Sequence, residues 1–285
     1  MLCTACRGKL SLFGRRDNYE YHRCLECGTI QLAPLPDEDE LLNAYALQYS
    51  KAEHYEVNPD LCIKAAQNYY LAIVQALRDF KVSGLVLDYG AGWGGLSQML
   101  LANGFQCQAL KISEDMAAYC QKKGLPVLRG NLNTFKEKDG LSALVLCTVF
   151  EHLVNHDEWM QNARRLIKTN GLLITLQPTA PFAYFMGRLL RFGSIRRPLP
   201  SLHHIFSPPW HTALLTLEGM RALASRNGFE LIEIRKAPQG REKGMIGAIQ
   251  SCLELMNRAG WRLIGHRWPF LTAHLFILRK VRNDN

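Results

Sequence analysis

Apolar and polar residues follow two alternating patterns along the middle of this chain. Short apolar runs, such as LVLDYG from position 85, CQALKIS from 107 and ALVLCTVF from 143, predict buried β-strands. Amphipathic segments at helical spacing follow them, as in EDMAAYCQKKG from 114 and DEWMQNARRLIKTNG from 157. This alternation predicts a doubly wound α/β domain with a mainly parallel sheet.

The chain divides into three segments by sequence pattern. Residues 1–36 end in a turn-rich, acidic stretch, and residues 37–83 predict a helical lead-in. The main domain spans 84–285, where the sequence FAYFMGRLLRFGSIRRPLP breaks the alternation and predicts an inserted helix or lid at about 181–215. A last strand is expected at 273–280. Helices should end at Gly104, Gly124 and Gly171.

The net charge of +9 is distributed unevenly. Positions 181–285 hold 16 Lys and Arg against 6 Asp and Glu, or +10, which leaves 18 against 19, or −1, for the rest. A basic last third suits nucleic acid, anionic lipid or a phosphorylated substrate, and it equally suits a solvated surface without a charged partner. In 182–197 and 245–263, Phe, Trp and Leu alternate with Arg, which favours docking on an anionic membrane surface.

Hydropathy indicates neither a membrane span nor a signal peptide, because no apolar run approaches about 18 residues and the N-terminus MLCTACRGKL is polar. The 48% of hydrophobic residues is ordinary for a soluble domain. We therefore expect a cytoplasmic protein, with peripheral contact to the inner membrane face as the alternative.

Four of the nine cysteines form two CxxC pairs near the N-terminus. Each pair can direct two thiolates at one tetrahedral ion, and the spacing predicts a structural zinc ribbon. Free thiols and a redox pair are the alternatives, and the latter is disfavoured because neither pair opens a helix beside a βαβ unit. The predicted zinc ligands are Cys3, Cys6, Cys24 and Cys27.

A glycine-rich turn follows the first strand of the main domain. LVLD at 85–88 runs into YGAGWGG, which places three glycines before a helix. Glycines let the backbone approach a ligand closely, and a helix N-terminus offers N–H groups to it. The pattern alone is shared by nicotinamide, flavin and S-adenosylmethionine (SAM) proteins.

The sequence around this turn resembles class I SAM-dependent methyltransferases. VLDYGAGWGG resembles their motif I, and LSALVLCTVFEHLVNHDEWMQNARRLIKTNGLLITLQPT resembles their fourth strand, the following helix and the fifth strand. The later HHIFS and LEGMRALASRNGFELIEI resemble a further block, so the resemblance covers about residues 84–236. It implies a Rossmann-like methyltransferase fold that uses SAM as the methyl donor.

The resemblance also implies roles for single residues. Asp88 would orient the turn and the SAM amino group, and Thr148 would lie near the sulfonium and the acceptor. His152 is the candidate general base or acceptor-orienting group, because a neutral imidazole can accept a proton near pH 7. Alternatively, Glu151 and His152 form a helix-start motif that only orders the loop. The predicted cofactor-binding residues are Asp88, Gly90, Ala91, Gly92, Gly94, Lys111, Ile112, Asn131, Leu132 and Thr148.

Two positions depart from the family pattern. The second strand of this fold normally ends in Asp or Glu, which accepts the ribose hydroxyls of SAM, and Lys111 stands there instead. A cation cannot accept those hydrogen bonds. Asn131 replaces the usual Asp after the third strand and can still accept through its amide oxygen. These departures bring methyl-transfer activity into question more than they do the fold.

The N-terminal third resembles the start of deoxysugar C-methyltransferases, in which a CxxC…CxxCG ribbon and a "P.P….L…Y…Y" stretch precede the SAM domain. Methyl transfer to a small-molecule, sugar or lipid-linked acceptor is therefore the leading interpretation. The first alternative is a catalytically degenerate methyltransferase-like partner or scaffold protein, which is favoured by Lys111 in place of the usual ribose-binding carboxylate. The second is an RNA methyltransferase, because some ribosomal RNA guanine methyltransferases also carry an N-terminal zinc finger.

Three further histidines stand close together in the predicted insertion: His203, His204 and His211. With the neighbouring Trp210 they suit a lid over an acceptor, and packing at the surface is the alternative. A second metal site is disfavoured here, because no carboxylate or cysteine belongs to the group.

Overall fold

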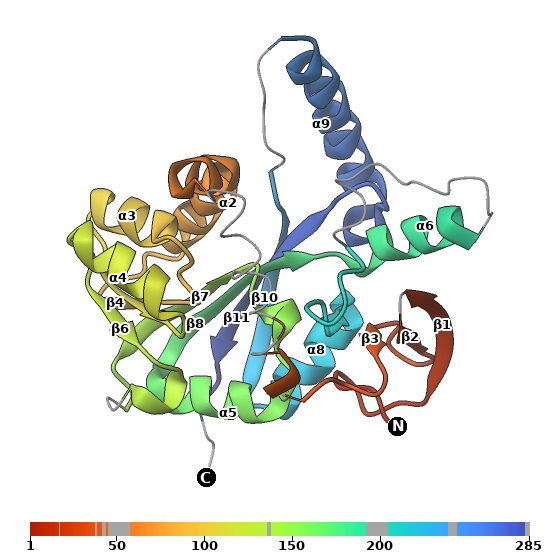
Figure 1. Cartoon of the computed structure of the whole chain (residues 1–285), viewed down its shortest axis with the longest axis horizontal. Helices are drawn as coiled ribbons and strands as arrows, with labels where there is room; N and C mark the ends of the chain where they lie inside the picture. The colour runs from red at the N-terminus through yellow and green to blue at the C-terminus, as the bar shows by residue number, and fades with distance from the viewer. Residues whose placement is uncertain are drawn as a thin grey trace.

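The computed structural model describes residues 1–16, 18–37, 39–41, 44, 58–135, 138–191, 205–238 and 244–282. Its centre is a seven-stranded sheet with the order β10-β11-β8-β7-β4-β5-β6 (Figure 1). The neighbours from β8 to β6 pair in parallel, and β11 and β10 are added antiparallel at one side. The strands are β4 (Leu85–Tyr89), β5 (Gln106–Lys111), β6 (Val127–Arg129), β7 (Leu141–Cys147), β8 (Ile167–Pro178), β10 (Phe229–Lys236) and β11 (Ala273–Lys280).

Helices cover both faces of this sheet because its strands are apolar on both sides. Successive side chains point to opposite faces. In β4, Val86 packs with α2 (Pro59–Asp79) and α3 (Gly95–Ala102), whereas Leu87 packs with α5 (His156–Leu166) and α8 (Leu217–Arg226). The predicted α/β fold with a mainly parallel sheet is confirmed, and the last strand has the predicted bounds.

The glycine predictions are correct at two of three helix ends. Gly104 and Gly124 lie just beyond α3 and α4 (Glu114–Lys122), with φ of 81° and 72°. Gly171 does not end a helix: α5 stops at Leu166 and Gly171 lies within β8. A Cβ on Gly171 would approach the Lys168 carbonyl oxygen to 2.9 Å, so a close backbone contact explains this glycine.

The N-terminal strands form a second sheet that includes a strand from much later in the chain. Its order is β1 (Leu10–Arg16), β2 (Tyr19–Cys24), β3 (Ile30–Leu32) and β9 (Ala213–Leu214). The register pairs Ile30 with Leu214 and Gln31 with Ala213. The N-terminal module, defined here as residues 1–32, is therefore joined to the rest of the chain by backbone hydrogen bonds.

The region predicted as an insertion begins with a helix, α6 (Ala180–Arg191). Its residues Phe182, Ala183 and Met186 pack with Ile30 and Leu32 of the N-terminal module. Helix α9 (Gly244–Ile264) projects away from the sheet at the top of Figure 1. In the described part of the chain, no helix has the length and apolarity needed to cross a membrane.

Three short 3-10 turns complete the described elements. The first, η2 (Leu132–Thr134), follows β6, and η3 (Phe150–His152) follows β7. The third, η4 (Gly265–Arg267), lies between α9 and β11. The turns η2 and η3 stand beyond the carboxyl ends of parallel strands, where α/β sheets bind ligands.

Candidate functional site

The predicted glycine turn connects the carboxyl end of β4 to α3. Gly90, Gly92 and Gly94 have φ of 73°, 54° and 80°, a region that side-chain-bearing residues rarely adopt. A Cβ on Gly90 would also come within 2.7 Å of Val149, so the turn packs closely against the segment after β7. The backbone N–H of Gly90 donates to the Leu110 carbonyl at 2.9 Å, which ties the turn to β5.

Asp88 lies at the base of this turn and is 1% exposed. Ser97, on α3, donates its hydroxyl to Asp88 Oδ2 at 2.6 Å. Burial raises the pKa of Asp88 to about 6, although the Ser97 hydrogen bonds and the charge of Lys111 lower it. The carboxyl group is therefore held in a fixed orientation and changes charge in mildly acidic solution.

Lys111 is the last residue of β5, where the family pattern has Asp or Glu. Burial lowers the pKa of Lys111, and the nearby Cys120 and Asp88 raise it. The same ammonium group influences the pKa of Asp88 and of His152, so it lies toward the interior of the site. The next residue, Ile112, has 52% of its surface exposed.

Asn131 and Leu132 follow β6 and form the start of η2. The Asn131 side chain accepts a hydrogen bond from the Asn133 backbone N–H at 3.0 Å, so its amide oxygen caps η2. Leu132 is 3% exposed and packs in the cluster that contains Leu110 and Phe135. Asn131 is thereby oriented by its own turn.

Thr148 stands directly after β7 and has a left-handed backbone with φ of 53°. This conformation is unfavourable for a β-branched residue, and such residues are concentrated at functional sites. The Thr148 backbone N–H donates to the Leu176 carbonyl at 2.8 Å, which helps to maintain the conformation. The side chain of Thr148 is exposed, and the residue stands two positions before η3.

Glu151, His152 and His211 lie together beyond β7, which corrects the expectation that no carboxylate accompanies the histidines. Their metal-ligating atoms all lie within 4.8 Å of one another. The rings of His152 and His211 meet edge to face with centroids 5.1 Å apart, and His152 Nε2 lies 3.9 Å from Glu151 Oε1. His203 and His204 fall outside the described residues.

The protonation of this cluster is set mainly by burial. Burial, with the charges of His211 and Lys111, lowers the pKa of His152 to about 3, against a backbone hydrogen bond to Trp210. Burial likewise raises the pKa of Glu151 to about 8. The His152 ring is therefore neutral at physiological pH and carries a lone pair.

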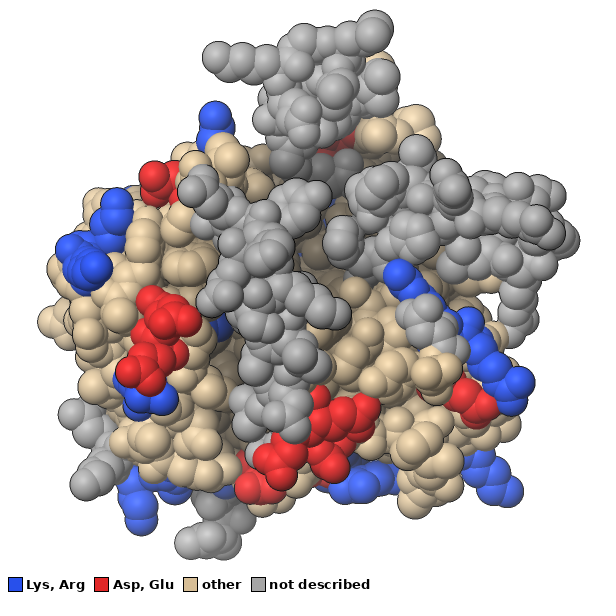
Figure 2. Space-filling model, in the orientation of Figure 1, with Lys and Arg blue, Asp and Glu red and all other residues tan. Residues whose placement is uncertain are grey.

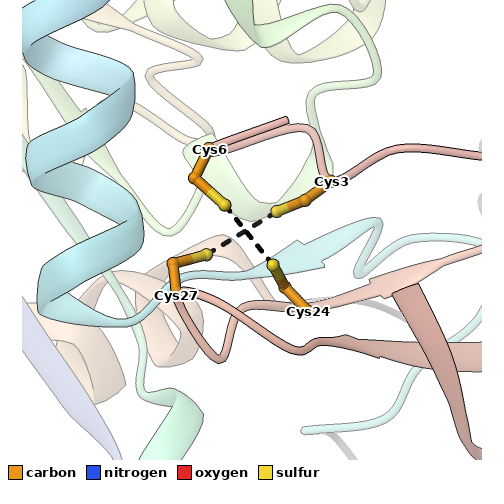
Figure 3. A group of neighbouring side chains, drawn as sticks. All are labelled: Cys3, Cys6, Cys24 and Cys27. Carbon is orange, nitrogen blue, oxygen red and sulfur yellow. Dashed lines mark hydrogen bonds between the residues drawn. The ribbon is translucent and has the colours of Figure 1, made fainter. Parts of the chain in front are cut away.

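The four N-terminal cysteines direct their sulfurs toward one centre (Figure 3). Cys3 Sγ lies 3.7 Å from Cys27 Sγ, and Cys6 Sγ lies 3.4 Å from Cys24 Sγ. A tetrahedral zinc ion with Zn–S bonds of about 2.3 Å separates its sulfurs by roughly 3.8 Å. The donor set and its spacing therefore fit zinc.

The backbone turns after Cys3 and Cys6 donate hydrogen bonds to the cysteine sulfurs, as is typical of cysteine-bound zinc sites. The N–H groups of Ala5 and Gly8 donate to Cys3 Sγ and Cys6 Sγ, each at 3.4 Å. The Cys3–Cys27 hydrogen bond lowers the pKa of the Cys27 thiol and raises that of Cys3. One thiolate is thus favoured before any ion binds.

The cysteine group is packed against the main domain. Cys3, Cys24 and Cys27 belong to the same apolar cluster as Phe150 and Leu223. Sequence reasoning did not reveal this contact, since the residues that hold it are dispersed along the chain. The Thr216 hydroxyl donates to the Cys27 carbonyl at 2.6 Å, Arg226 donates to the Ala5 and Thr4 carbonyls, and Asp157 accepts from both Arg7 and Arg226.

Positive charge is dispersed on the face of the molecule in Figure 2. Lys and Arg of the described residues lie there in separate groups, with groups of Asp and Glu between them. Binding to nucleic acid requires basic residues gathered on one face or along a groove. On the described part of this face, Lys and Arg form one short stripe at the right of the view and smaller groups elsewhere, interrupted by Asp and Glu.

The central part of the chain, residues 63–234, matches the protein family described as "Methyltransferase domain". No curated protein matches the chain. Solved structures share its fold at low identity. The 1,6-didemethyltoxoflavin-N1-methyltransferase of Burkholderia thailandensis has 12% identity and a TM-score of 0.56, over 96% of this chain and all 100% of its own. A SAM-dependent methyltransferase from Archaeoglobus fulgidus has 16% identity and a TM-score of 0.52, over 82% and 99%.

Proposed function

Because the chain belongs to the methyltransferase-domain family, we propose that it transfers a methyl group from SAM to a small-molecule, sugar or lipid-linked acceptor. The observation that carries this proposal is the buried Asp88 beside a turn of left-handed glycines, within the matched segment. SAM supplies an electrophilic methyl group on a sulfonium. The protein's task is to hold that methyl group in line with the acceptor.

On the methyl-donor side, the Asp88 carboxylate accepts a hydrogen bond from the SAM amino group. Ser97 on α3 holds this carboxylate in place through its own hydrogen bond. Gly90, Ala91 and Gly92 leave room for the methionine part. Asn131 caps η2 through its amide oxygen. It stands after β6, where the family pattern has the residue that contacts adenine. These roles follow from the resemblance and from the position of each residue at a strand end.

On the acceptor side, Thr148 and His152 follow β7. A neutral His152 can accept a hydrogen bond from an acceptor hydroxyl or amine, which orients the attacking lone pair. With a pKa of about 3 it binds a proton only weakly, so orientation is its main role. Methyl transfer often requires no more than such alignment.

The N-terminal module would hold one structural zinc ion on Cys3, Cys6, Cys24 and Cys27. The four sulfurs fit a closed tetrahedral site, with no position left for a substrate. Zinc would supply stability that a module of this size cannot gain from its own core. Through the packing around Cys27 and Phe150, that stability extends to the domain.

Calorimetric titration of the full-length protein with SAM tests the proposal. We expect binding at pH 8, and Asp88→Asn should weaken it at least tenfold, because a hydrogen bond to a charged group contributes about 1.5–3 kcal/mol. Asp79→Asn is the matched control, since Asp79 is exposed at the end of α2 and pairs with Arg235. A folded wild-type protein that does not bind SAM would instead support the degenerate partner or scaffold function, for which Lys111 is the motivating residue.

An RNA acceptor is the second candidate, motivated by the zinc ribbon and the basic last third of the sequence. Filter binding with RNA over a series of salt concentrations distinguishes it from a small acceptor. RNA binding should fall steeply with salt if phosphates are contacted.

A further inference from the structure

A buried carboxyl group and two imidazoles lie together at the carboxyl edge of the sheet, separate from the four cysteines. Glu151 and His152 belong to η3, and His211 precedes β9. Glu151 is 2% exposed. In the described part of the chain, its Oε2 atom has no hydrogen-bond partner. Leaving such a group buried is costly unless a cation or a donor meets it.

The two segments that carry the cluster are held together by direct hydrogen bonds. The Thr212 backbone N–H donates to the Glu151 carbonyl at 2.8 Å. The Thr212 hydroxyl shares its single donor hydrogen between the carbonyl oxygens of Glu151 and Leu153. Thr212 is completely buried, so the position of His211 relative to Glu151 is fixed by the backbone.

Each imidazole is oriented by the backbone. His211 Nδ1 lies 2.9 Å from the Ile205 carbonyl oxygen. A carbonyl can only accept, so Nδ1 carries the hydrogen and Nε2 carries the lone pair of the neutral ring. Metal-binding histidines are typically oriented in this way by a carbonyl or a carboxylate. His152 is similarly tied to the Trp210 backbone.

The separations require only a small contraction around an ion. Imidazole nitrogens and carboxylate oxygens bind zinc at about 2.0–2.2 Å, which places neighbouring donors roughly 3.3 Å apart. The donors here lie within 4.8 Å of one another, with 3.9 Å between Glu151 Oε1 and His152 Nε2. A closure of up to about 1.5 Å is within the reach of side-chain torsions that stay in their rotamer wells.

We propose that Glu151, His152 and His211 bind a divalent transition-metal ion, with Zn²⁺ as the best match, and that the ion keeps a position open for an oxygen of the acceptor. Two imidazoles and one carboxylate are a donor set of catalytic rather than structural metal sites. The ion site follows from these three residues alone. The assignment of the open position to the acceptor rests on the proposed methyl transfer, and with the ion bound it is the ion, in place of the His152 lone pair, that orients the acceptor.

This arrangement favours an acceptor that presents a hydroxyl group. Coordination lowers the pKa of the hydroxyl, which releases its proton to solvent. The oxygen lone pair then forms a bond to the methyl carbon, while the carbon–sulfur bond of SAM breaks and its electron pair stays on sulfur. The products are the methyl ether, S-adenosylhomocysteine and one proton.

Titration with Co²⁺ tests the site in the full-length protein that has first received one equivalent of zinc per chain, which the four cysteines take up and which leaves the three-residue site for Co²⁺. We expect one Co²⁺ ion per chain in addition to the zinc, with d–d absorption but without the sulfur-to-metal charge transfer that replacement at the cysteines would give. Glu151→Gln and His211→Gln should each weaken Co²⁺ binding at least tenfold, because the first replaces a charged carboxylate ligand by a neutral amide and the second removes an imidazole ligand. His266→Gln is the matched control, since His266 faces Glu218 at 3.7 Å elsewhere.

Two outcomes would overturn the proposal. The first is wild-type protein that holds one equivalent of zinc and binds no Co²⁺, and this measurement does not depend on any variant being folded. The second is Co²⁺ binding of equal strength in wild type and in variants that circular dichroism shows to be folded. SAM titration of the same samples tests the two proposals separately. Wild-type protein that binds Co²⁺ but not SAM would contradict the proposed methyl transfer and leave the proposed metal site standing.

Discussion

At the scale of single residues, Asp88 gives the donor site a pH dependence. Its pKa of about 6 means that the carboxylate is mostly protonated at pH 5 and mostly ionised at pH 7. The ionised form attracts the SAM ammonium, so SAM affinity should rise as the pH increases through about 6 and then level off. Calorimetry across this range measures the midpoint.

Ser97→Ala provides the check on this assignment. The Ser97 hydroxyl lowers the Asp88 pKa, so the variant should move the midpoint to higher pH. Asp88→Asn should remove the dependence. A midpoint that is unchanged in both variants would assign the titration to another group.

Lys111 provides a second residue-scale prediction. Lys111→Glu restores the carboxylate that accepts the ribose hydroxyls in related enzymes. Hydrogen bonds to a charged group near the low end of about 1.5–3 kcal/mol give roughly tenfold tighter SAM binding at pH 8. Since Lys111 lowers the Asp88 pKa, the variant should also raise the Asp88 midpoint.

Lys111→Gln separates the new acceptor from the lost charge, because it removes the cation without adding a carboxylate. Weaker SAM binding by the Glu variant than by wild type would contradict the interpretation of Lys111 as a tolerated loss. A site adapted to a ligand with an additional anionic group should instead bind that ligand more weakly after Lys111→Glu. Related sheets use a cation at this place for the phosphate of NADP.

Sequence spacing predicted contacts between residues that are close along the chain. It could not predict contacts between residues that meet only after folding. The CxxC pairs and the strand-turn pattern around Asp88 are local, and the structure brings their groups together as expected. The Glu151–His211 contact joins positions 60 residues apart, and it depends on hydrogen bonds made by Thr212. A carboxylate directly before His152 was the available signal, and it was interpreted as a loop-ordering group.

At the scale of elements, Cys24→Ser should release zinc from the N-terminal module. From the sequence, the effect is expected to stay within about the first thirty residues and to spare the α/β core. The structure extends that expectation, because Cys24 shares an apolar cluster with α5 and α8. We therefore expect about one zinc less per chain by atomic emission, together with faster amide hydrogen exchange in β1–β3 and β9.

Cys252→Ser is the matched control, since Cys252 is exposed on α9, away from the cysteine group. It should leave zinc content and hydrogen exchange as in wild type. A metal-free protein with a fully protected N-terminus would remove the zinc assignment.

Helix α9 leads to a prediction about membranes. It exposes Leu255 and Leu263, at 69% and 80%, on an element that also carries Arg258 and Arg262. Apolar and basic side chains together favour an anionic lipid surface. We expect more co-sedimentation with anionic than with neutral vesicles, and a clear loss for Leu255→Gln combined with Leu263→Gln. Leu101→Gln on α3 is the control, and equal sedimentation with both vesicle types would contradict the prediction.

Helices and strands with a strong periodic pattern of apolar residues were predicted from the sequence. Strands that form only because they pair with a distant strand were not. The strands β4, β7 and β11 have apolar runs that are buried on both faces, β5 has a shorter buried stretch at Ala109 and Leu110, and each strand was identified. Strand β9 has only two residues, so no periodicity can reveal it. Its existence depends on pairing with β3, which sequence pattern does not encode.

At the scale of the whole molecule, strand-helix alternation was sufficient to predict the main sheet. Right-handed crossovers and parallel pairing leave few arrangements for such a chain. The docking of the N-terminal module could not be predicted, because it depends on dispersed polar contacts such as those of Arg226 with the Ala5 and Thr4 carbonyls.

The β3–β9 pairing also sets an order of events during protein synthesis. Ile30 leaves the ribosome long before its partner Leu214, which is 184 positions later in the chain. At about 5–20 residues per second, β3 waits roughly 10–40 s with one edge unpaired. An early zinc ion would keep the nascent module compact and protect that edge from pairing with another chain. Zinc supply during translation, rather than afterwards, would then determine the yield of correctly assembled protein.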